Sequence, residues 1–352
     1  MDRYIGLDAH KETCTLAVMG PSGKRIKERV VETNIKLLIE EIRSIAGTLH
    51  LCMEEGAQSA WLYEMLEPYV DELVVVMPEK RQGSKSDSID AWELAERMRT
   101  RRFGTRVFKA PQRFTRLRQA VRAHRVAVRE MVRAKNRLKA QYRARGVREL
   151  SDQVYDGEKR VSWLRKLTGP HRDLAELMSL QLDAAVQAHE RAEKWLLAEA
   201  KQVPDVALLH TVPGLGPIRA SQIVSVVVVP ERFRTKRQFW SYCGLGIEIR
   251  SSSDWKKDGF TGGLVRRSKS QSRGLTRKRN ALLKEVFKGA AQRVICMNGQ
   301  PLRADYERMI AAGTKPHLAV LTIARRIASA TLAIWKRKEV YTPEKHLANR
   351  AA

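Results

Sequence analysis

Three features are missing from this chain of 352 residues. Its four cysteines are scattered, with no Cys-x-x-Cys pair and no nearby histidine at ligand spacing, which argues against a disulfide framework or a zinc site. No apolar run approaches the roughly 18 residues of a membrane-spanning helix, and no signal peptide with a cleavage site is recognisable. We therefore expect a soluble, cytoplasmic protein with no membrane partner and with buried, reduced thiols.

Acidic residues are also scarce. Against 66 Lys and Arg there are 39 Asp and Glu, which gives a formal net charge of +27. A field of that sign favours polyanions, among which nucleic acid is the usual partner and an acidic membrane is the competitor. The length is ample for a core and suggests about two or three domains.

The first hundred residues alternate strands and helices, which predicts an α/β domain. Two short apolar runs at residues 4–9 and 13–19, separated by a tight turn, are typical of a hairpin. Further apolar patterns predict strands at 25–31, 49–53 and 73–77, with helices between them.

Four carboxylates lie at strand ends or at a helix start in this region. Asp8 and Glu54 (or its neighbour Glu55) each follow a strand, and Asp87 and Asp90 are three residues apart, so they share one helix face. Each alone has an ordinary explanation as a solvated turn residue or as an acid favoured by the helix dipole. Together they suit two hard cations such as Mg²⁺, which can clamp the attacking and leaving oxygens of a phosphodiester.

The middle of the chain predicts two long helices, over residues 111–146 and 173–201. Joined by a short break, they favour an antiparallel pair that forms a coiled-coil arm or a dimer contact. A run of charge is usually a solvated face, but one sign dominates the first helix over several turns, which favours phosphate contacts. The candidate phosphate contacts are Arg116, Arg122, Arg129, Arg133 and Lys139.

A further, mainly helical domain is expected from residue 203. Residues 209–220 indicate a helix, a glycine turn and a second helix. Gly214 and Gly216 in this turn would let backbone N–H groups approach a phosphate, although a plain helix–helix turn has the same pattern. Helices are expected again from Leu275 to about Val294 and over 316–335.

A triple serine, Ser251 to Ser253, follows with basic neighbours Arg250, Lys256 and Lys257. Composition alone favours a flexible, solvated loop here. The same positive charge could stabilise negative charge that develops during a reaction on nucleic acid.

Several of these segments resemble the IS-one-ten family of insertion-sequence transposases. The N-terminal motifs resemble its DEDD signature, and the later motifs resemble its second domain. The motifs cover nearly the whole chain in the family's order, and they are Ile5-Gly6-Leu7-Asp8-Ala9-His10-Lys11, Met53-Glu54-Glu55-Gly56, Lys85-Ser86-Asp87-Ser88-Ile89-Asp90-Ala91, Thr211-Val212-Pro213-Gly214-Leu215-Gly216 and Tyr242-Cys243-Gly244-Leu245 with the serine that follows.

The resemblance implies a fold class of α/β plus α. It implies an RNase H-like domain similar to the Holliday-junction resolvase RuvC over residues 1–108 and a basic long-helix or coiled-coil linker over 109–202. A transposase domain with a helix-hairpin-helix-like motif and a catalytic serine would then occupy 203–340, with a tail from 341 to 352.

By the same resemblance, Asp8, Glu54, Asp87 and Asp90 would bind Mg²⁺. Ser252, seven residues after Leu245, would be the nucleophile that forms a covalent link to DNA, activated by a base or by a metal. The family usually has glycine after this serine, whereas Ser253 stands here, so Ser251 remains an alternative to Ser252, and Glu55 to Glu54. The serine and the carboxylates would form a composite site, within one chain or between subunits.

The implied partners are donor and target DNA, a structured guide RNA encoded by the element, and further copies of the chain in a dimer or tetramer. Two alternatives stay open. One is an Mg²⁺-dependent RuvC-like nuclease or junction resolvase without a covalent intermediate. The other is a non-catalytic nucleic-acid-binding protein whose carboxylates are structural.

Overall fold

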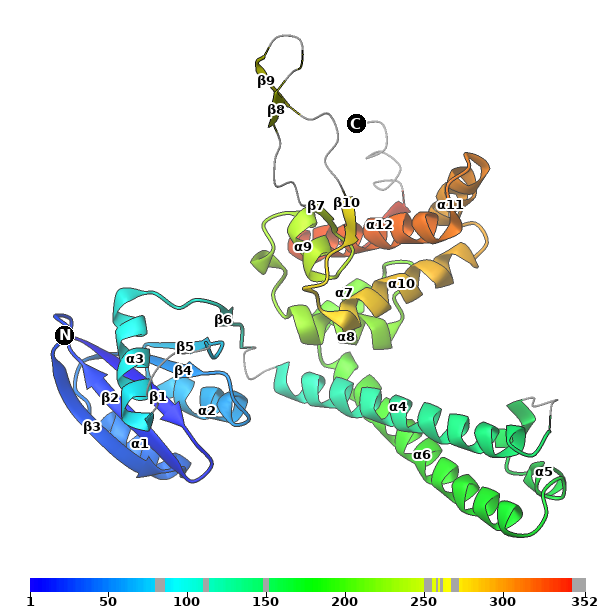
Figure 1. Ribbon diagram of the computed structural model, residues 1–352, viewed down its shortest axis with the longest axis horizontal. Coiled ribbons are helices and arrows are strands. Elements are labelled where there is room, and N and C mark those ends of the chain that lie inside the picture. Colours follow the sequence, from blue (N-terminus) through cyan, green and yellow to red (C-terminus); the bar gives the residue numbers. More distant parts are fainter. Residues whose placement is uncertain are drawn as a thin grey trace. The chain divides into compact units, whose positions relative to one another are not determined.

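The computed structural model describes residues 1–79, 86–109, 114–147, 152–249, 255–257, 259, 262–266 and 272–343 (Figure 1). The chain divides into two compact units, Met1–Arg113 and Phe114–Ala352. The first is α/β and the second is mainly helical, so the predicted class of α/β plus α is correct at this level. The finer division into four segments stays a prediction.

The first unit is built on a six-stranded mixed sheet with the order β3-β2-β1-β4-β5-β6. β1 is antiparallel to β2 and parallel to β4, and β4 is parallel to β5. The hairpin at the start of the chain and the other strands expected from the apolar pattern are thus confirmed, and the short β6 is an addition. The strands are β1 (Asp2–Ala9), β2 (Thr13–Met19), β3 (Arg25–Glu32), β4 (Thr48–Glu54), β5 (Glu72–Val76) and β6 (Arg106–Val107).

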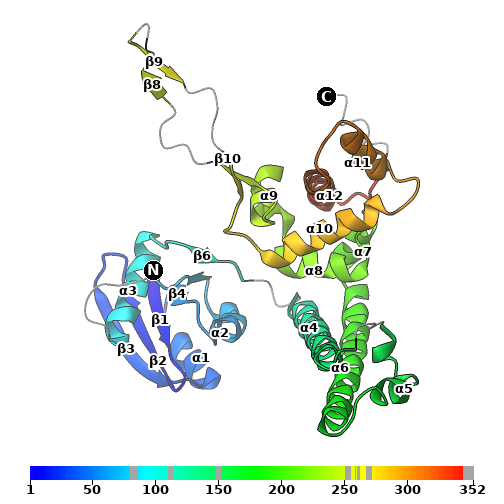
Figure 2. The same ribbon diagram turned by 45° about the vertical axis from the view of Figure 1, so that its right-hand side comes forward.

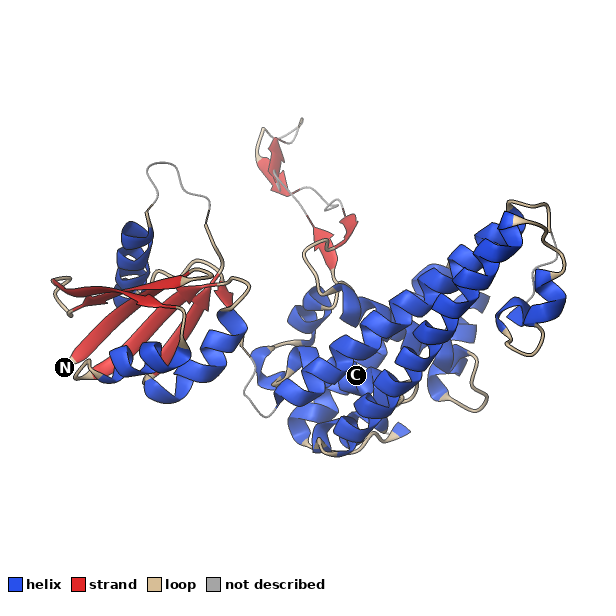
Figure 3. Ribbon diagram, turned by 90° about the horizontal axis from the view of Figure 1, so that it is seen from below, coloured by secondary structure: helices blue, strands red, loops and turns tan. Residues whose placement is uncertain are grey.

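Helices cover both faces of this sheet (Figure 3). Ile5 and Leu7 of β1 belong to the core cluster that includes Leu38 of α1 (Ile35–Arg43) and Leu62 of α2 (Ser59–Leu66). A short 3-10 turn, η1 (Glu67–Tyr69), follows α2. The residues of the opposite parity face α3 (Asp87–Thr100), whose Ala91, Trp92 and Ala95 pack with Ala17 and Met19 of β2. Because strand residues alternate between faces, the parity of a residue in β1 or β4 decides which helices it meets.

The second unit begins with a helical hairpin. α4 (Thr115–Arg143) and α6 (Pro170–Lys201) lie side by side (Figures 1 and 2). Between them lie η3 (Asp152–Tyr155) and α5 (Arg160–Leu164). Gly169 adopts a positive φ of 57° and Pro170 is the first residue of α6. These two residues let the chain turn before the second helix of the hairpin begins. The predicted antiparallel helix pair is confirmed.

The remaining helices form the core of the second unit. They are α7 (Pro204–His210), α8 (Pro217–Val227), the 3-10 turn η4 (Pro230–Arg232), α9 (Lys236–Tyr242), α10 (Ala281–Ile295), α11 (Pro301–Ala311) and α12 (Pro316–Arg337). The expectation that no apolar run approaches a membrane-spanning length needs one correction: within the described part of the chain, α12 alone is long and apolar enough to cross a membrane by length and composition. It carries Arg325 and Arg326, and its fully buried Ile323 and Trp335 belong to this core.

Four short strands that the sequence patterns did not predict lie between α9 and α10. β7 (Ile247–Ile249) pairs with β10 (Ser272–Leu275), and β8 (Trp255–Lys257) pairs with β9 (Leu264–Arg266). Leu275 therefore ends a strand, and the helix predicted to start there begins at Ala281 instead. The expectation that every cysteine is buried is also wrong, because Cys296 is exposed.

Candidate functional site

The register of two neighbouring parallel strands fixes the positions of two of the four predicted carboxylates. Gly6 pairs with Cys52 and Leu7 pairs with Met53 in the β1–β4 ladder. Asp8 and Glu54 lie one position further along, at the carboxyl ends of both strands. Both have the parity of Gly6 and Cys52, which places them on the face of the sheet that α3 covers.

The other two carboxylates open α3. The side chain of Ser86 accepts a hydrogen bond from the backbone N–H of Ile89 at 3.3 Å and so caps the helix. Asp87 and Asp90 fill the first helical turn, where the helix dipole stabilises negative charge. α3 packs closely on β1, so this turn lies near the end of the strand that carries Asp8.

His10 joins the two halves of the site. Its Nε2 lies 3.1 Å from Oδ2 of Asp8 and 3.2 Å from Oδ1 of Asp87. Ligand atoms of Asp8, His10 and Asp87 all lie within 4.8 Å of one another. Glu54 and Asp90 are not part of this closest group. The sequence contained His10 in a motif but did not single it out, and its place two residues after Asp8 was the signal available.

Negative charge is crowded at Asp8. Burial is the main cause that raises the pKa of Asp8, whose side chain is 13% exposed. The carboxylates of Asp90 and Asp87 raise this pKa further, whereas His10 lowers it. Such a cluster is destabilised when ionised and is stabilised by a cation.

Glu54 and Glu55 lie in different surroundings. Oε2 of Glu55 accepts hydrogen bonds from Nζ of Lys109 at 2.5 Å and from Oγ of Ser59 at 2.9 Å. Ser59 is the first residue of α2, on the opposite side of the sheet from α3. Glu55 is therefore engaged away from the carboxylate group, while the parity of Glu54 directs it toward that group.

Most of the predicted serine site lies outside the described residues. This applies to Ser251, Ser252 and Arg250, while Lys256 and Lys257 belong to β8. The motif just before them is firmly held. The carbonyl oxygen of Leu245 accepts a hydrogen bond from Nε of Arg325 at 2.8 Å. Indole Nε1 of Trp240 donates to the carbonyl oxygen of Arg325 at 3.1 Å. The segment that leads to the serines is thus anchored on α12.

The glycine turn between α7 and α8 has a packing role. Gly214 has a φ of +81°, and a Cβ there would lie 2.5 Å from the carbonyl oxygen of Ala290 in α10. A side chain is excluded at this position by both conformation and contact. Gly216 differs, because a Cβ there would meet no atom within 4 Å. The glycine at 214 is explained by helix packing, and a phosphate contact at either glycine stays a prediction.

Comparison with known proteins agrees with this arrangement. A DEDD transposase family model, described as "Transposase", matches residues 5–144. A second model, described as "Transposase IS116/IS110/IS902 family", matches residues 206–307. The chain belongs to the IS110 family. The DEDD match includes the strands and the helix that carry the four carboxylates, and the second match begins within α7 and ends within α11.

One curated relative of this IS110-family chain is a "Transposase for insertion sequence element IS1533" from Leptospira borgpetersenii. The two are 34% identical over 110 residues, which is 29% of this chain and 32% of the relative. The match thus spans about a third of the relative's length.

The predicted phosphate contacts of α4 fall into two groups. Arg116 forms an ion pair with Glu199 at 2.7 Å, Arg133 with Glu130 at 2.8 Å and Lys139 with Asp152 at 3.2 Å. Arg122 and Arg129 instead line a hollow of about 170 Å³ between α4, α8 and α10. The same hollow is lined by Arg118 and Arg125, so this stretch of α4 concentrates positive charge at a concave surface.

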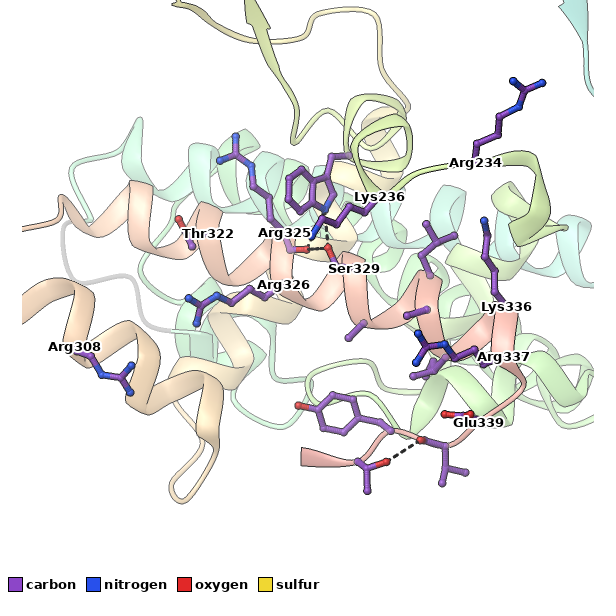
Figure 4. Close-up of a pocket in the computed structure, with 18 residues that line it drawn as sticks. Arg234, Lys236, Arg308, Thr322, Arg325, Arg326, Ser329, Lys336, Arg337 and Glu339 are labelled. Atoms are coloured by element: carbon purple, nitrogen blue, oxygen red, sulfur yellow. Dashed lines mark hydrogen bonds between the residues drawn. The ribbon is translucent and has the colours of Figure 1, made fainter. Parts of the chain in front are cut away.

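A second basic surface lies along α12. A pocket of about 1110 Å³ lies beside it (Figure 4), and α9, α11 and α12 all contribute to its lining. Trp240 adds an aromatic side chain to the lining, and Glu339 is its acidic member among the described residues. Cationic groups beside an aromatic ring are a chemistry that accepts nucleotides. The cationic lining residues are Arg234, Lys236, Arg308, Arg325, Arg326, Lys336 and Arg337.

Proposed function

We propose that this IS110-family chain cleaves and rejoins DNA strands during transposition of an insertion sequence. The proposal rests on Asp8 and Glu54 at the neighbouring carboxyl ends of β1 and β4 and on Asp87 and Asp90 in the first turn of α3, within a chain of this family. Such an enzyme acts on DNA, which places it in the cytoplasm of its host, at the nucleoid when it acts.

The strand order supports an RNase H-like, RuvC-like fold for the first unit. Three antiparallel strands, β3, β2 and β1, continue into the parallel strands β4 and β5. In this proposal the central strand β1 presents the first carboxylate, and α3, which follows β5, presents the last two. A rigid sheet end is a suitable base for a site that must hold its ligands within fractions of an ångström.

The donor set fits a divalent metal, and we propose Mg²⁺. Carboxylate oxygens are the ligands that Mg²⁺ prefers, and the cluster at Asp8 favours a cation because burial and neighbouring acids raise the pKa of that group. When bound, the metal would act as a Lewis acid on the scissile phosphate. Asp8, Glu54, Asp87 and Asp90 would hold it, and His10 would keep Asp8 and Asp87 in position.

The nucleophile in this proposal is Ser252, with Ser251 as the neighbouring alternative. Its hydroxyl oxygen would attack the phosphorus, so that a serine–phosphate bond forms and the bond to one sugar oxygen breaks. The serine proton is lost and the leaving sugar oxygen takes up a proton. Because one phosphodiester replaces another, a DNA hydroxyl can later reverse the step without an external energy source. Arg250, Lys256 and Lys257 would stabilise the developing negative charge.

The proposed partners are donor DNA, target DNA and a structured guide RNA, bound by a dimer or tetramer of the chain. The net charge of +27 supports a large polyanion. The hollow beside Arg122 and Arg129 and the basic pocket beside α12 offer two separate places for phosphates. Two such surfaces on one unit suit a protein that holds more than one nucleic acid.

A strand-exchange assay tests the proposal. The purified chain, its element-derived RNA, donor and target DNA and Mg²⁺ should yield recombinant junctions. Asp87→Asn should reduce their yield by at least about 100-fold, since a metal ligand is removed at unchanged size. Glu93→Gln on the same helix is the matched control and should retain activity. Hydrolytic cutting without exchange would favour the metal-dependent nuclease, and binding without cutting would favour the non-catalytic protein.

A further inference from the structure

The seam between α4 and α6 contains a polar cluster at one level. His124 of α4 is 6% exposed, although its neighbours along the buried face of the helix are apolar, namely Ala120, Val121 and Ala127. Across the seam lie His189 and Glu193 of α6. These two are four residues apart, so they share one helix face. Ligand atoms of all three residues lie within 4.8 Å of one another.

The protein alone does not satisfy His124. Its Nδ1 is buried and has no hydrogen-bond partner among the described residues. The ring of His189 lies beside it, with 5.3 Å between the centroids. A buried polar nitrogen without a partner destabilises a fold, and leucine would serve better at a position that only packs. A ligand bound to His124 would remove this destabilisation and would explain why a histidine stands at this position.

We propose that His124, His189 and Glu193 bind a zinc-type divalent metal ion that links α4 to α6. Two imidazole nitrogens and one carboxylate oxygen are a known donor set for zinc, with a water molecule in the fourth position. The side chains of His189 and Glu193 are 20% and 37% exposed, so solvent reaches this position. Burial, aided by the neighbouring His189, lowers the pKa of His124, which favours the neutral ring that a metal needs.

The two ligands on α6 require only small side-chain adjustments. Nε2 of His189 and Oε2 of Glu193 are 3.9 Å apart. Ligand atoms about 2.0–2.1 Å from a tetrahedral zinc ion are roughly 3.3 Å apart. Both residues belong to α6, and rotation about their side-chain bonds can close that difference, while the ligand atom of His124 lies within 4.8 Å of both.

The proposed site differs chemically from the carboxylate cluster of the first unit. Imidazole favours zinc, copper or nickel, whereas carboxylate oxygens alone favour magnesium. Excess Mg²⁺ should therefore occupy the carboxylates without displacing zinc from the helix pair. The site also stands apart from the proposed function, since its test measures metal binding and involves no DNA.

The test is zinc titration of the full-length chain after chelator treatment, in excess Mg²⁺, followed by calorimetry. Wild type should bind one zinc ion more per chain than His124→Leu does. Bound Co²⁺ should give wild type the intense visible bands of a tetrahedral site, and His124→Leu should lack them. His171→Gln, which removes another histidine of α6, is the matched control and should behave as wild type.

Thermal unfolding supplies a second readout. Zinc should raise the unfolding midpoint of wild type by several degrees, because it binds only the folded helix pair. His124→Leu should show no such rise, while its metal-free midpoint should equal or exceed that of wild type. If this variant does not fold, Glu193→Gln carries the test. Its zinc affinity should fall by more than the roughly 10- to 100-fold that removing a hydrogen-bond partner of a metal ligand causes. Equal zinc stoichiometry and affinity in wild type and the folded variant would overturn the proposal, as would failure of wild type to bind zinc.

Discussion

Gly6 of β1 lies directly against Ala91 of α3. A Cβ on Gly6 would be 1.9 Å from the carbonyl oxygen of Ala91 and 2.5 Å from the backbone nitrogen of Ala95. No side chain fits in that space, so the glycine sets how closely α3 approaches the sheet. Asp8 follows two residues later and Asp87 opens α3. The glycine thereby fixes the separation between the two halves of the carboxylate site.

Gly6→Ala should therefore impair both stability and chemistry. Backbone atoms must move to make room, which typically costs about 1–3 kcal/mol in a packed core, or more. The same movement separates Asp87 from Asp8 and should lower Mg²⁺-dependent strand cleavage. Denaturant unfolding and a cleavage assay measure the two effects. Gly56→Ala is the matched control, since a Cβ there would meet no atom within 4 Å. Wild-type behaviour of Gly6→Ala in both assays would contradict the assigned role.

Glu54→Gln and Glu55→Gln should have different effects. Glu54→Gln should reduce cleavage by at least about 100-fold at nearly unchanged stability, because the proposed metal ligand is removed. Glu55→Gln should retain cleavage but destabilise the fold by about 1–3 kcal/mol, because Lys109 loses its charged partner. Cleavage assays and urea unfolding of both variants measure these effects on activity and stability. The reverse pattern would make Glu55 the ligand.

The two groups of basic residues on α4 should differ in nucleic-acid binding. Arg122→Met and Arg129→Met should each weaken binding. With duplex DNA, the logarithm of the binding constant falls linearly with the logarithm of the salt concentration. Each variant should make this slope less steep by about 0.9 for every phosphate that it no longer neutralises. Arg133→Met should change that slope little, because Arg133 is paired with Glu130. Filter binding over a salt series measures the slopes. Equal slopes for all three variants would remove the basis for this distinction.

The Arg116–Glu199 pair gives a pH prediction. The hydrogen bond from Arg116 is the main cause that lowers the pKa of Glu199 below its usual value of 4.5. A lowered folded-state pKa means that the pair stabilises the fold above about pH 4.5 and that this contribution disappears as pH falls through the lower folded value. Wild type should be more stable than Arg116→Met at pH 7, and the difference should shrink in acid. A difference that stays constant in unfolding experiments from pH 7 to pH 3 would count against the pair.

Sequence patterns were sufficient to predict the features that depend only on residues close together in the chain. Apolar runs that end in a carboxylate located Asp8 and Glu54 at strand ends, and Asp87 and Asp90 were correctly placed at the start of a helix, α3. The sequence could not decide between Glu54 and Glu55, because that choice depends on which face of the sheet each residue meets. It also could not show that His10 bridges Asp8 and Asp87, since this contact depends on how α3 packs against β1.

The second unit shows a different limit. β7 to β10 are three or four residues long, too short for an alternating pattern to be recognised. The role of Gly214 depends on Ala290, which lies in a helix far along the chain. The partners of His124 are likewise distant in sequence and meet only when α4 and α6 pair. Such features arise from tertiary packing, which single-sequence patterns do not contain.

The most direct measurement of the central proposal is an assay for a covalent protein–DNA adduct. Wild type, with RNA, donor and target DNA and Mg²⁺, should remain attached to a DNA end on denaturing gels. Ser252→Ala should abolish the adduct, while Ser251→Ala and Ser253→Ala should retain it. Loss of the adduct in Ser251→Ala alone would move the nucleophile by one residue. Efficient cutting by wild type with no adduct, or an adduct that survives all three substitutions, would contradict serine chemistry at this site.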